Sequence, residues 1–545
     1  MSIRCRLLIF MMLAFLVSQL LATNQMPLMN TIYGEFNGDE FGAAMVAMDY
    51  NGDNYDDLIV VAKYWNATGV LGAYYPGKLY FYWGGPDGLS STPGFVIEGQ
   101  SHTQFAPRMC NAGDMNGDGI EDLAITYSTD IPWGAYKSIA IFLGGSNPQI
   151  TPDYVCTIPY TSVLPVYLGD VNGNGISDLA FWGWHLSQRY SYFTFIWTDL
   201  ESDPIHFMDG GVYGSPIYLG GVGDVNGDGF DDAYLAFPNT QGDIGLHGAN
   251  LLYGNESASM VDSQMLVESF DDGNPRVSPL GDINGDGFAD FMGYAVWPNH
   301  YLWLGSTALD SIPDLTLSLN SPDYDMQSFQ SPDTEYAVYG DLNGDGYDDF
   351  VCSDPLTNGY NGQAGLWLGG QYVNSTVDLV FDPPSDWQWR NFGHAKAVGD
   401  FDGDGCDDLA LSCPRWMDGG FHFPGRIYVY AGNAQLQDTT VANDDPVAPP
   451  ASVEDWRINI YPNPCHCGIE MVSVDLRGES FSKEGDYSYG LFNIRGQKVQ
   501  QGLVNAEDFR KRKFDIAVNE LGAGIYLMTV SYFGDIKNVK KIVMY

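Results

Sequence analysis

Short apolar runs, separated by segments rich in glycine, asparagine and aspartate, recur along most of the chain. Representative runs are Leu58-Ile59-Val60-Val61, Leu123-Ala124-Ile125-Thr126 and Leu409-Ala410-Leu411-Ser412. Each is too short for a buried helix and is bounded by turn-forming residues, which is typical of β-strands. A second kind of run is aromatic and ends in glycine, as in KLYFYWGG from Lys78, SIAIFLGG from Ser138 and GLWLGG from Gly365. The pattern predicts an all-β chain.

A nine-residue loop of alternating acidic or amide residues precedes the apolar runs seven times, at spacings of 54 to 65 residues. The loops begin at Asp49, Asp114, Asp170, Asp224, Asp282, Asp341 and Asp400. A period of this size fits a four-stranded propeller blade with generous loops. The repeats therefore predict a seven-bladed β-propeller over residues 23–437.

Side-chain oxygens occupy positions 1, 3, 5 and 9 of each loop, and position 7 offers a backbone carbonyl. This donor set suits a hard cation, and we expect Ca²⁺ because Mg²⁺ demands tighter octahedral geometry. Glycine at position 4 supplies a turn that a Cβ would obstruct. We predict up to seven structural Ca²⁺ ions, bound by Asp49, Asn51, Asp53, Tyr55, Asp57, Asp114, Asn116, Asp118, Ile120, Asp122, Asp170, Asn172, Asn174, Ile176, Asp178, Asp224, Asn226, Asp228, Phe230, Asp232, Asp282, Asn284, Asp286, Phe288, Asp290, Asp341, Asn343, Asp345, Tyr347, Asp349, Asp400, Asp402, Asp404, Cys406 and Asp408.

An EF-hand-type loop is the main alternative, and it needs Glu at position 12. Position 12 is instead Val60, Ile125, Phe181, Leu235, Gly293, Cys352 or Leu411, none of which offers a side-chain oxygen to calcium. A metal-free Asx-rich turn is the alternative for any single loop, and seven copies in register argue against it. Ligand charge ranks the sites: the third loop, with Asn174 at position 5, is expected to bind most weakly.

Each repeat shares further elements. Phe41-Gly42 and Phe392-Gly393 precede their loops, and Pro76-Gly77 and Pro424-Gly425 precede aromatic runs. Together with the Asp-rich loops, they resemble the FG-GAP repeat, the blade unit of the integrin α-subunit propeller. The resemblance covers residues 28–433 and implies that the face opposite the metal loops binds a ligand.

The last repeat runs through RIYVYAGN, from Arg426 to Asn433, without a fourth strand of its own. The segment from Leu28 to Glu35 precedes the first repeat and has a strand to donate. We predict that it closes blade seven and hides two sheet edges.

Residues 438–455 are rich in Pro, Ala and Asp, which predicts a linker. Beyond it, alternating apolar residues predict a small C-terminal β-sandwich over residues 456–545. The motifs Ile460–Pro464, Leu491–Val499, Leu521–Tyr526 and the basic ending Lys540–Tyr545 closely resemble the C-terminal sorting domain of the type IX secretion system of Bacteroidetes-like bacteria. The resemblance implies the type IX machinery as a partner and release or anchoring at the cell surface. A plain accessory sandwich is the alternative.

The N-terminus resembles a targeting segment. Arg4 and Arg6 precede the apolar run Leu7–Val17, and the small residue Ala22 follows. We predict that residues 1–22 are a cleaved signal peptide, with a membrane-anchored N-terminus as the alternative. The run is shorter than a transmembrane helix requires, and no later stretch qualifies.

The net charge is −45, with 24 basic and 69 acidic residues. Such a balance argues against nucleic acid and anionic lipid as partners. The hydrophobic content of 45% argues against disorder. Much of the acidity lies in the seven loops, and the rest fits an exported surface protein.

The cysteines do not form an obvious disulfide framework, because seven remain once Cys5 is set aside. Cys406 with Cys413 is the most plausible local pair. Cys465-His466-Cys467 offers metal ligands, but without a second ligand pair we favour structural cysteines there.

Six tryptophans fall in the segments between predicted second and third strands of the blades: Trp65, Trp133, Trp182, Trp184, Trp297 and Trp416. Aromatic loops on one rim suit stacking on sugars or anchoring a protein, although such rings also pack under neighbouring loops. The chain lacks GxSxG, HExxH and P-loop motifs, so no catalytic residue is predicted. We favour an exported calcium-binding module for glycan or protein ligands; a carbohydrate-active enzyme (polysaccharide lyase or glycosidase) and a structural surface-layer component are the alternatives.

Overall fold

The computed structural model describes two groups of residues. In the first part of the chain these are residues 25–66, 76–99, 105–127, 137–158, 162–185, 191–209, 218–237, 248–258, 263–267, 276–296, 299–318, 337–355, 361–383, 391–414, 416–418 and 421–437. In the last part they are residues 457–461, 471–477, 487–493, 498–504, 511, 513–518, 524–532 and 535–544. The predicted signal peptide (1–22) and linker (438–455) lie outside the described residues.

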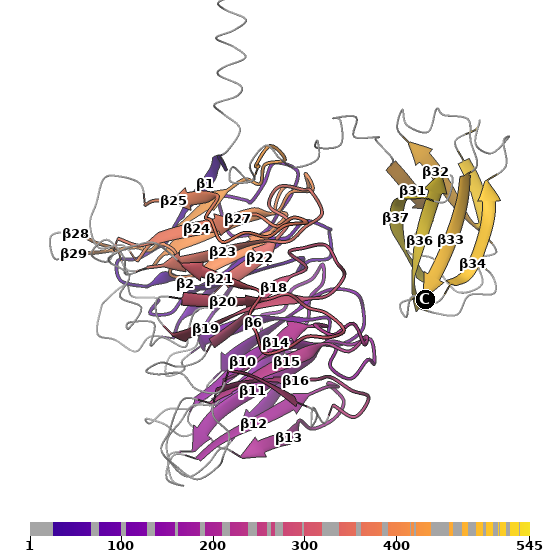
Figure 1. The fold of residues 1–545 in the computed structure, drawn as a ribbon. Coiled ribbons are helices and arrows are strands. Elements are labelled where there is room, and N and C mark those ends of the chain that lie inside the picture. Colours follow the sequence, from indigo (N-terminus) through magenta and orange to yellow (C-terminus); the bar gives the residue numbers. More distant parts are fainter. Residues whose placement is uncertain are drawn as a thin grey trace, which may run out of the picture. The chain divides into compact units, whose positions relative to one another are not determined.

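The chain divides into two compact units, Met1–Thr440 and Val441–Tyr545. Their described strands are drawn in Figure 1. Within the described part of the chain, no helix combines the length and the apolar character needed to span a membrane.

The described residues of the first unit form seven four-stranded antiparallel sheets, which confirms the predicted β-propeller. Blades one to four are β2 (Phe41–Met48), β3 (Asp57–Ala62), β4 (Lys78–Tyr82), β5 (Phe95–Glu98); β6 (Phe105–Gly113), β7 (Asp122–Tyr127), β8 (Lys137–Phe142), β9 (Tyr154–Ile158); β10 (Ser162–Gly169), β11 (Asp178–His185), β12 (Ser191–Trp197), β13 (Ile205–Asp209); and β14 (Tyr218–Gly223), β15 (Asp232–Phe237), β16 (Gly248–Leu252), β17 (Ser263–Val267). Blades five to seven are β18 (Arg276–Gly281), β19 (Asp290–Val296), β20 (Asn299–Trp303), β21 (Leu315–Ser318); β22 (Ala337–Gly340), β23 (Asp349–Asp354), β24 (Gln363–Trp367), β25 (Leu379–Phe381); and β26 (Lys396–Gly399), β27 (Asp408–Cys413), β30 (Arg426–Tyr430), β1 (Leu28–Tyr33).

Blade seven is completed by the N-terminal strand. β1 pairs antiparallel with β30, with Leu28 opposite Tyr430 and Tyr33 opposite Arg426. This confirms the predicted closure, in which one pairing covers an edge on each strand.

Stacking of the blades explains why the second strands are continuously apolar. Leu58 and Val60 of β3 pack in one cluster with Ala410 of blade seven. Their neighbour Ile59 packs in another cluster with Leu123 of blade two. Because alternate side chains of a strand point to opposite faces, a blade between two others buries both faces.

The first strands of all seven blades line a central cavity of about 500 Å³. Its lining is largely apolar, with Arg108, Glu121 and Lys396 as its charged described residues. The second strands lie outside the first, so the nine-residue loops that join these two strands gather at one end of the propeller.

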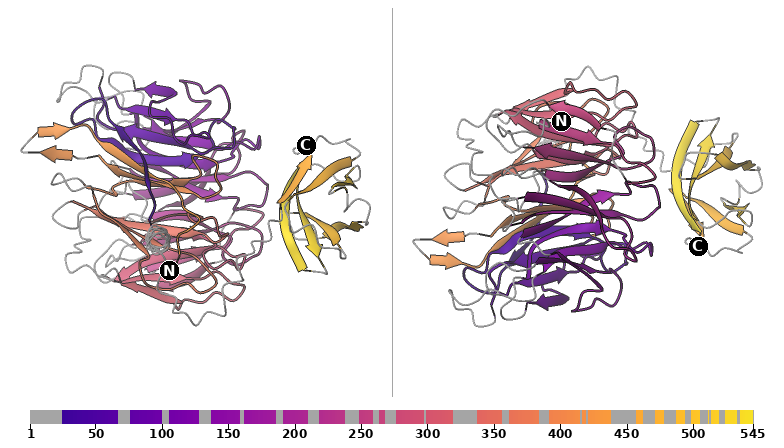
Figure 2. Two further views of the ribbon diagram at one scale, coloured as in Figure 1. Left: turned by 90° about the horizontal axis from the view of Figure 1, so that it is seen from above. Right: turned by 90° about the horizontal axis from the view of Figure 1, so that it is seen from below.

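The segment between β27 and β30 forms a hairpin of β28 (Trp416–Asp418) and β29 (Phe421–Phe423). It projects from the blades in both views of Figure 2. Since it joins the second and third strands of blade seven, it leaves the sheet at the end opposite the Asp400 loop.

The second unit contains two antiparallel sheets among its described residues, in the orders β31-β32-β35 and β34-β33-β36-β37. The strands are β31 (Arg457–Tyr461), β32 (Met471–Arg477), β33 (Tyr487–Asn493), β34 (Lys498–Val504), β35 (Lys513–Ala517), β36 (Gly524–Tyr532) and β37 (Asp535–Met544). Val474 and Ile516 of the first sheet and Leu491 and Met528 of the second are fully buried. This agrees with the predicted β-sandwich.

The predicted Cys406–Cys413 disulfide is wrong, because neither cysteine forms a disulfide in the structure. β27 begins at Asp408 and ends at Cys413, so the two cysteines lie at opposite ends of an extended segment. At about 3.3 Å per residue they are roughly 20 Å apart, far beyond the reach of a disulfide. The Cys465-His466-Cys467 motif lies outside the described residues.

Candidate metal centres in the seven loops

The first aspartate of each loop organises the backbone around itself. In blade seven, Oδ1 of Asp400 accepts hydrogen bonds from the N–H groups of Gly403 and Asp404, at 2.7 and 3.1 Å. Oδ2 accepts a third from the N–H of Gly405 at 3.1 Å. Asp114 and Asp224 make the same three bonds in their loops. The carboxylate therefore fixes the curvature of the loop.

Positions 3 and 5 continue this pattern. Oδ1 of Asp402 accepts the N–H of Asp404 at 3.1 Å, and Oδ1 of Asp404 accepts the N–H of Cys406 at 2.9 Å. Each side chain thus anchors the backbone two residues further on through one oxygen. In the second loop the amide Nδ2 of Asn116 lies 3.0 Å from Oδ2 of Asp118, so neighbouring side chains face one another.

Left-handed backbone is required at positions 4 and 6. Gly403 and Gly405 have φ angles of 74° and 90°. In the first loop Asn54 stands at position 6 with φ of 68°, and asparagine is among the side chains that best tolerate this region.

Position 9 holds a buried carboxylate at the start of each second strand. Asp408 is 1% exposed; its Oδ2 accepts the N–H of Phe401 at 3.1 Å and its Oδ1 the N–H of Gly432 at 2.8 Å. The side chain therefore joins the loop to the end of β30. Burial raises the pKa of this carboxyl in every blade, to about 7 for Asp57, Asp122, Asp290 and Asp408 and to about 8 for Asp178, Asp232 and Asp349.

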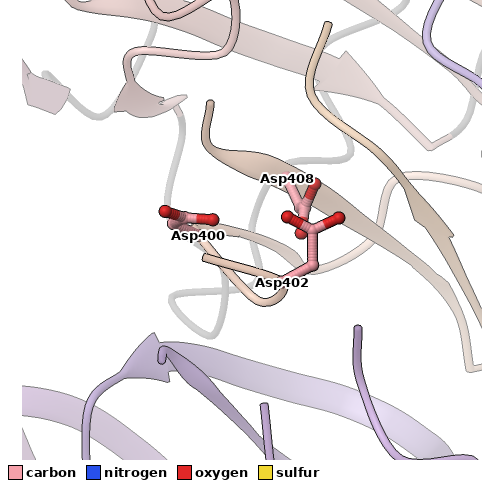
Figure 3. Close-up of side chains that lie close together, drawn as sticks. All are labelled: Asp400, Asp402 and Asp408. Carbon is pink, nitrogen blue, oxygen red and sulfur yellow. The ribbon is translucent and has the colours of Figure 1, made fainter. Parts of the chain in front are cut away.

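Three carboxylates converge in blade seven. Oxygen atoms of Asp400, Asp402 and Asp408 all lie within 4.8 Å of one another. Figure 3 shows the three side chains turned toward a common point from the loop and the start of β27. In the other loops position 3 is asparagine, so fewer charged oxygens are present. The donor set in blade seven fits a hard, oxygen-seeking cation such as Ca²⁺.

Of the six tryptophans of the predicted aromatic rim, Trp65 is the one whose side chain the structure describes. Trp65 is buried at 4% exposure, and its indole nitrogen donates to Oε2 of Glu35 at 3.0 Å. Trp182 and Trp184 lie within β11 rather than in a loop, because this strand continues to His185. Trp416 begins β28. Trp133 and Trp297 lie outside the described residues.

The sequence analysis noted the glycines that end the third strands but assigned them no role. A Cβ added to Gly432 would lie 2.5 Å from the carbonyl oxygen of Asp407 and 2.6 Å from the Cβ of Cys406. Gly84, Gly144, Gly254, Gly305 and Gly369 make the equivalent close approach to their loops. The paired glycines of KLYFYWGG and GLWLGG were the available signal, since they let the loop and third strand touch.

Two family models match parts of the chain. Residues 392–430 match the FG-GAP repeat model, and residues 459–545 match the secretion system C-terminal sorting domain. Phosphatidylinositol-glycan-specific phospholipase D is 28% identical over 179 residues in Bos taurus and 30% identical over 180 residues in Homo sapiens, in each case 30% of this chain and 19% of the relative. Integrin alpha-PS2 of Drosophila melanogaster is 28% identical over 177 residues, 30% of this chain and 12% of the relative.

The chain spans less than a fifth of the length of each of these relatives. The matches show an FG-GAP repeat in blade seven and a secretion system C-terminal sorting domain at the end of the chain, and part of the chain is similar to an integrin α subunit. The sorting domain indicates type IX secretion to the cell surface or extracellular space in Bacteroidetes-like bacteria.

Proposed function

We propose that this FG-GAP propeller holds a calcium ion in each of its seven loops and acts, after export, as a binding or adhesion module. The observation that carries the calcium assignment is the convergence of Asp400, Asp402 and Asp408. It is supported by the same loop architecture in all seven blades, each with a buried carboxylate at position 9.

The protein prepares each site before any ion arrives. Asp400 holds the loop curved, and Asp402 and Asp404 each accept the N–H of the residue two positions later. Asp408 adds a buried carboxylate, and placing its charge out of water is costly without a partner. A bound calcium ion would supply positive charge that offsets this cost, and Asp400, Asp402 and Asp408 are the residues that would hold it.

Calcium is therefore expected to stabilise the propeller, and thermal unfolding tests this. Added calcium should raise the unfolding temperature, and chelation with EGTA should lower it again. Asp408→Asn removes the buried carboxylate charge of blade seven and should reduce the rise in unfolding temperature that calcium causes. Glu201→Gln, which neutralises an exposed acid outside the loops, is its matched control and should leave that rise unchanged. An unfolding temperature that is the same with calcium and with EGTA would refute the metal assignment.

The binding role rests on the fold and on the hairpin β28–β29, which projects from the end of blade seven opposite its loop. The integrin resemblance implies that ligands bind on that side. The candidate partner is a surface glycan or protein, met after the sorting domain has engaged the type IX machinery. A glycan array with the full chain, in calcium and in EGTA, tests the glycan branch: calcium-dependent retention supports it, and formation of cleaved product would instead favour a carbohydrate-active enzyme. If no glycan on the array is bound, the ligand to be sought is a protein that binds the same surface.

A further inference from the structure

Each loop is held by the blade that follows it. Asp56, at position 8 of the first loop, accepts the backbone N–H of Asp400 on Oδ2 at 2.9 Å. The N–H of Asp56 in turn donates to the carbonyl oxygen of Asp400 at 3.1 Å. These two bonds join residues 344 positions apart. They fix both backbone groups of the residue that organises the blade-seven loop.

The same contact recurs around the propeller. Acidic side chains at position 8 accept the N–H of the first aspartate of the preceding loop in the pairs Glu121 with Asp49, Asp231 with Asp170, Asp348 with Asp282 and Asp407 with Asp341, at 3.1, 2.7, 2.7 and 2.8 Å. Ser177 and Ala289 occupy position 8 in the remaining two loops and contact Asp114 and Asp224 through their backbone N–H groups.

In blades three, five, six and seven, a glycine before the loop makes room for this carboxylate. A Cβ on Gly399 would lie 2.5 Å from Oδ2 of Asp56, and one on Gly281 would collide with the carboxylate of Asp348. The first loop is preceded by Met48 instead of glycine, and its partner is the longer Glu121. The residue before the loop is therefore matched in size to the acidic side chain at position 8 of the next blade.

Blade one grips the blade-seven loop at two further points. The N–H of Gly85 donates to the carbonyl oxygen of Phe401 at 2.9 Å. The ring of Tyr55 covers the turn at Gly403, where an added Cβ would lie 2.5 Å from its Cε1 atom. Asp56 follows Tyr55, whose carbonyl is a candidate ligand, and precedes the buried carboxylate Asp57.

We propose that Asp56 is a positioning residue for the cation of blade seven, so that an ion held in one blade is supported by the next across the joint where the propeller closes. This inference rests on the proposed calcium binding. Asp56 is not part of the carboxylate cluster of Asp400, Asp402 and Asp408. It orients Asp400, and because it stands between two ligand positions of the first loop, an ion in that loop also steadies the Asp400 contact.

Hydrogen–deuterium exchange of the full chain, followed by peptide mass spectrometry during a calcium titration, reads each loop separately. In Asp56→Ala, the calcium concentration that half-protects the peptide over residues 400–408 should rise at least tenfold, as expected for loss of an outer partner of a metal ligand. Asp56→Asn should rescue most of this loss, because its Oδ1 still accepts the N–H of Asp400.

Asp348→Ala is the matched control, since Asp348 holds the blade-five loop in the same way. Asp348→Ala should raise the calcium concentration that half-protects the peptide over residues 282–290. The value for the peptide over residues 400–408 should stay unchanged. The positioning role requires that calcium protects the wild-type loops and that Asp56→Ala changes the half-protecting calcium concentration of the blade-seven loop alone. It is refuted if Asp56→Ala leaves this concentration unchanged, or raises it equally for all loops. If no wild-type loop responds to calcium, the proposed function itself fails.

Discussion

The indole nitrogen of Trp65 donates a hydrogen bond to Oε2 of Glu35 at 3.0 Å, while Oε1 of the same carboxylate pairs with Nζ of Lys78 at 2.9 Å. Nζ also lies 4.9 Å from the centroid of the Trp65 ring and 3.3 Å from Glu98. Lys78 is buried, so this cluster neutralises a cation inside blade one. Glu35 lies two residues after Tyr33, the last residue of the closing strand β1, so the cluster anchors the end of that strand.

Removing the Glu35 carboxylate should destabilise the propeller. Glu35→Ala leaves a buried indole N–H and the lysine short of an acceptor, and we expect a loss of about 2 kcal/mol in the free energy of unfolding. Glu35→Gln keeps an acceptor and should lose about half as much. Urea unfolding at constant calcium measures both. Glu98→Gln is the control, because this half-exposed partner should matter little; equal stability of Glu35→Ala and wild type would contradict the prediction.

Charge at position 5 should set the affinity of the blade-three loop. Asn174→Asp adds a third carboxylate beside Asp170 and Asp178, and we expect roughly tenfold tighter calcium binding. Its Oδ1 can still accept the N–H of Ile176, as Asn174 does at 2.7 Å. Without calcium the variant should be less stable, because Asn174 Nδ2 now donates to the carbonyl of Thr198 and a carboxylate oxygen would be repelled there. Calorimetry measures the calcium affinity, and hydrogen–deuterium exchange of the peptide over residues 170–178 without calcium measures the stability of the loop. Unchanged or weaker calcium binding would contradict the prediction that more carboxylates in a loop give tighter binding.

His300 should make the propeller sensitive to acid. Burial lowers the pKa of this imidazole from 6.5 to about 4, so the folded state favours the neutral form. The titration of His300 leaves the free energy of unfolding unaffected above pH 6.5. It lowers this free energy as the pH drops from 6.5 to 4, by about 3 kcal/mol in total. His300→Phe should lose this slope. Urea unfolding at pH 7 and pH 5 compares the two proteins, and since all loop carboxylates titrate in both, the difference isolates the histidine. Parallel curves would show that His300 does not contribute.

The hairpin β28–β29 should matter for ligand retention and not for calcium. Replacing residues 416–423 with a short glycine-serine turn should abolish calcium-dependent binding to whichever ligand the wild type retains. The calcium-induced rise in unfolding temperature should remain, because the hairpin leaves the sheet opposite the loop. Ile312→Ser, at a residue 71% exposed between β20 and β21, is a surface control that should retain both properties. If the variant without the hairpin still retains the ligand fully, the hairpin is not part of the binding surface.

Local sequence was enough to find the strands and loops. Leu58 to Val61 reads as a strand because stacked blades bury both of its faces, and the spacing within DFDGDGCDD alone places Asp400, Asp402 and Asp408 on the inside of one turn. These features depend on neighbours within about ten residues, so periodicity reveals them.

Contacts between blades were not visible in the same way. Asp56 reads as one more acidic residue until Asp400 is brought beside it from the other end of the propeller. Trp65 reads as a loop aromatic because nothing near it in sequence announces Glu35 and Lys78 as its neighbours. Cys406 and Cys413 are close in sequence, but the strand between them holds them apart.

The pairing of β1 with β30 also bears on the order in which the propeller can be completed. Blades one to six form from local segments, whereas Leu28 and Tyr430 meet only after roughly 400 residues have been laid down between them. Joining ends this distant costs about 3 kcal/mol more chain entropy than closing a twenty-residue hairpin. Until then blade seven shows an open edge that accepts β1 from any copy. In a monomer, β1 closes its own blade seven. At high protein concentration, incompletely folded chains would exchange β1 and form domain-swapped dimers with native contacts within the blades.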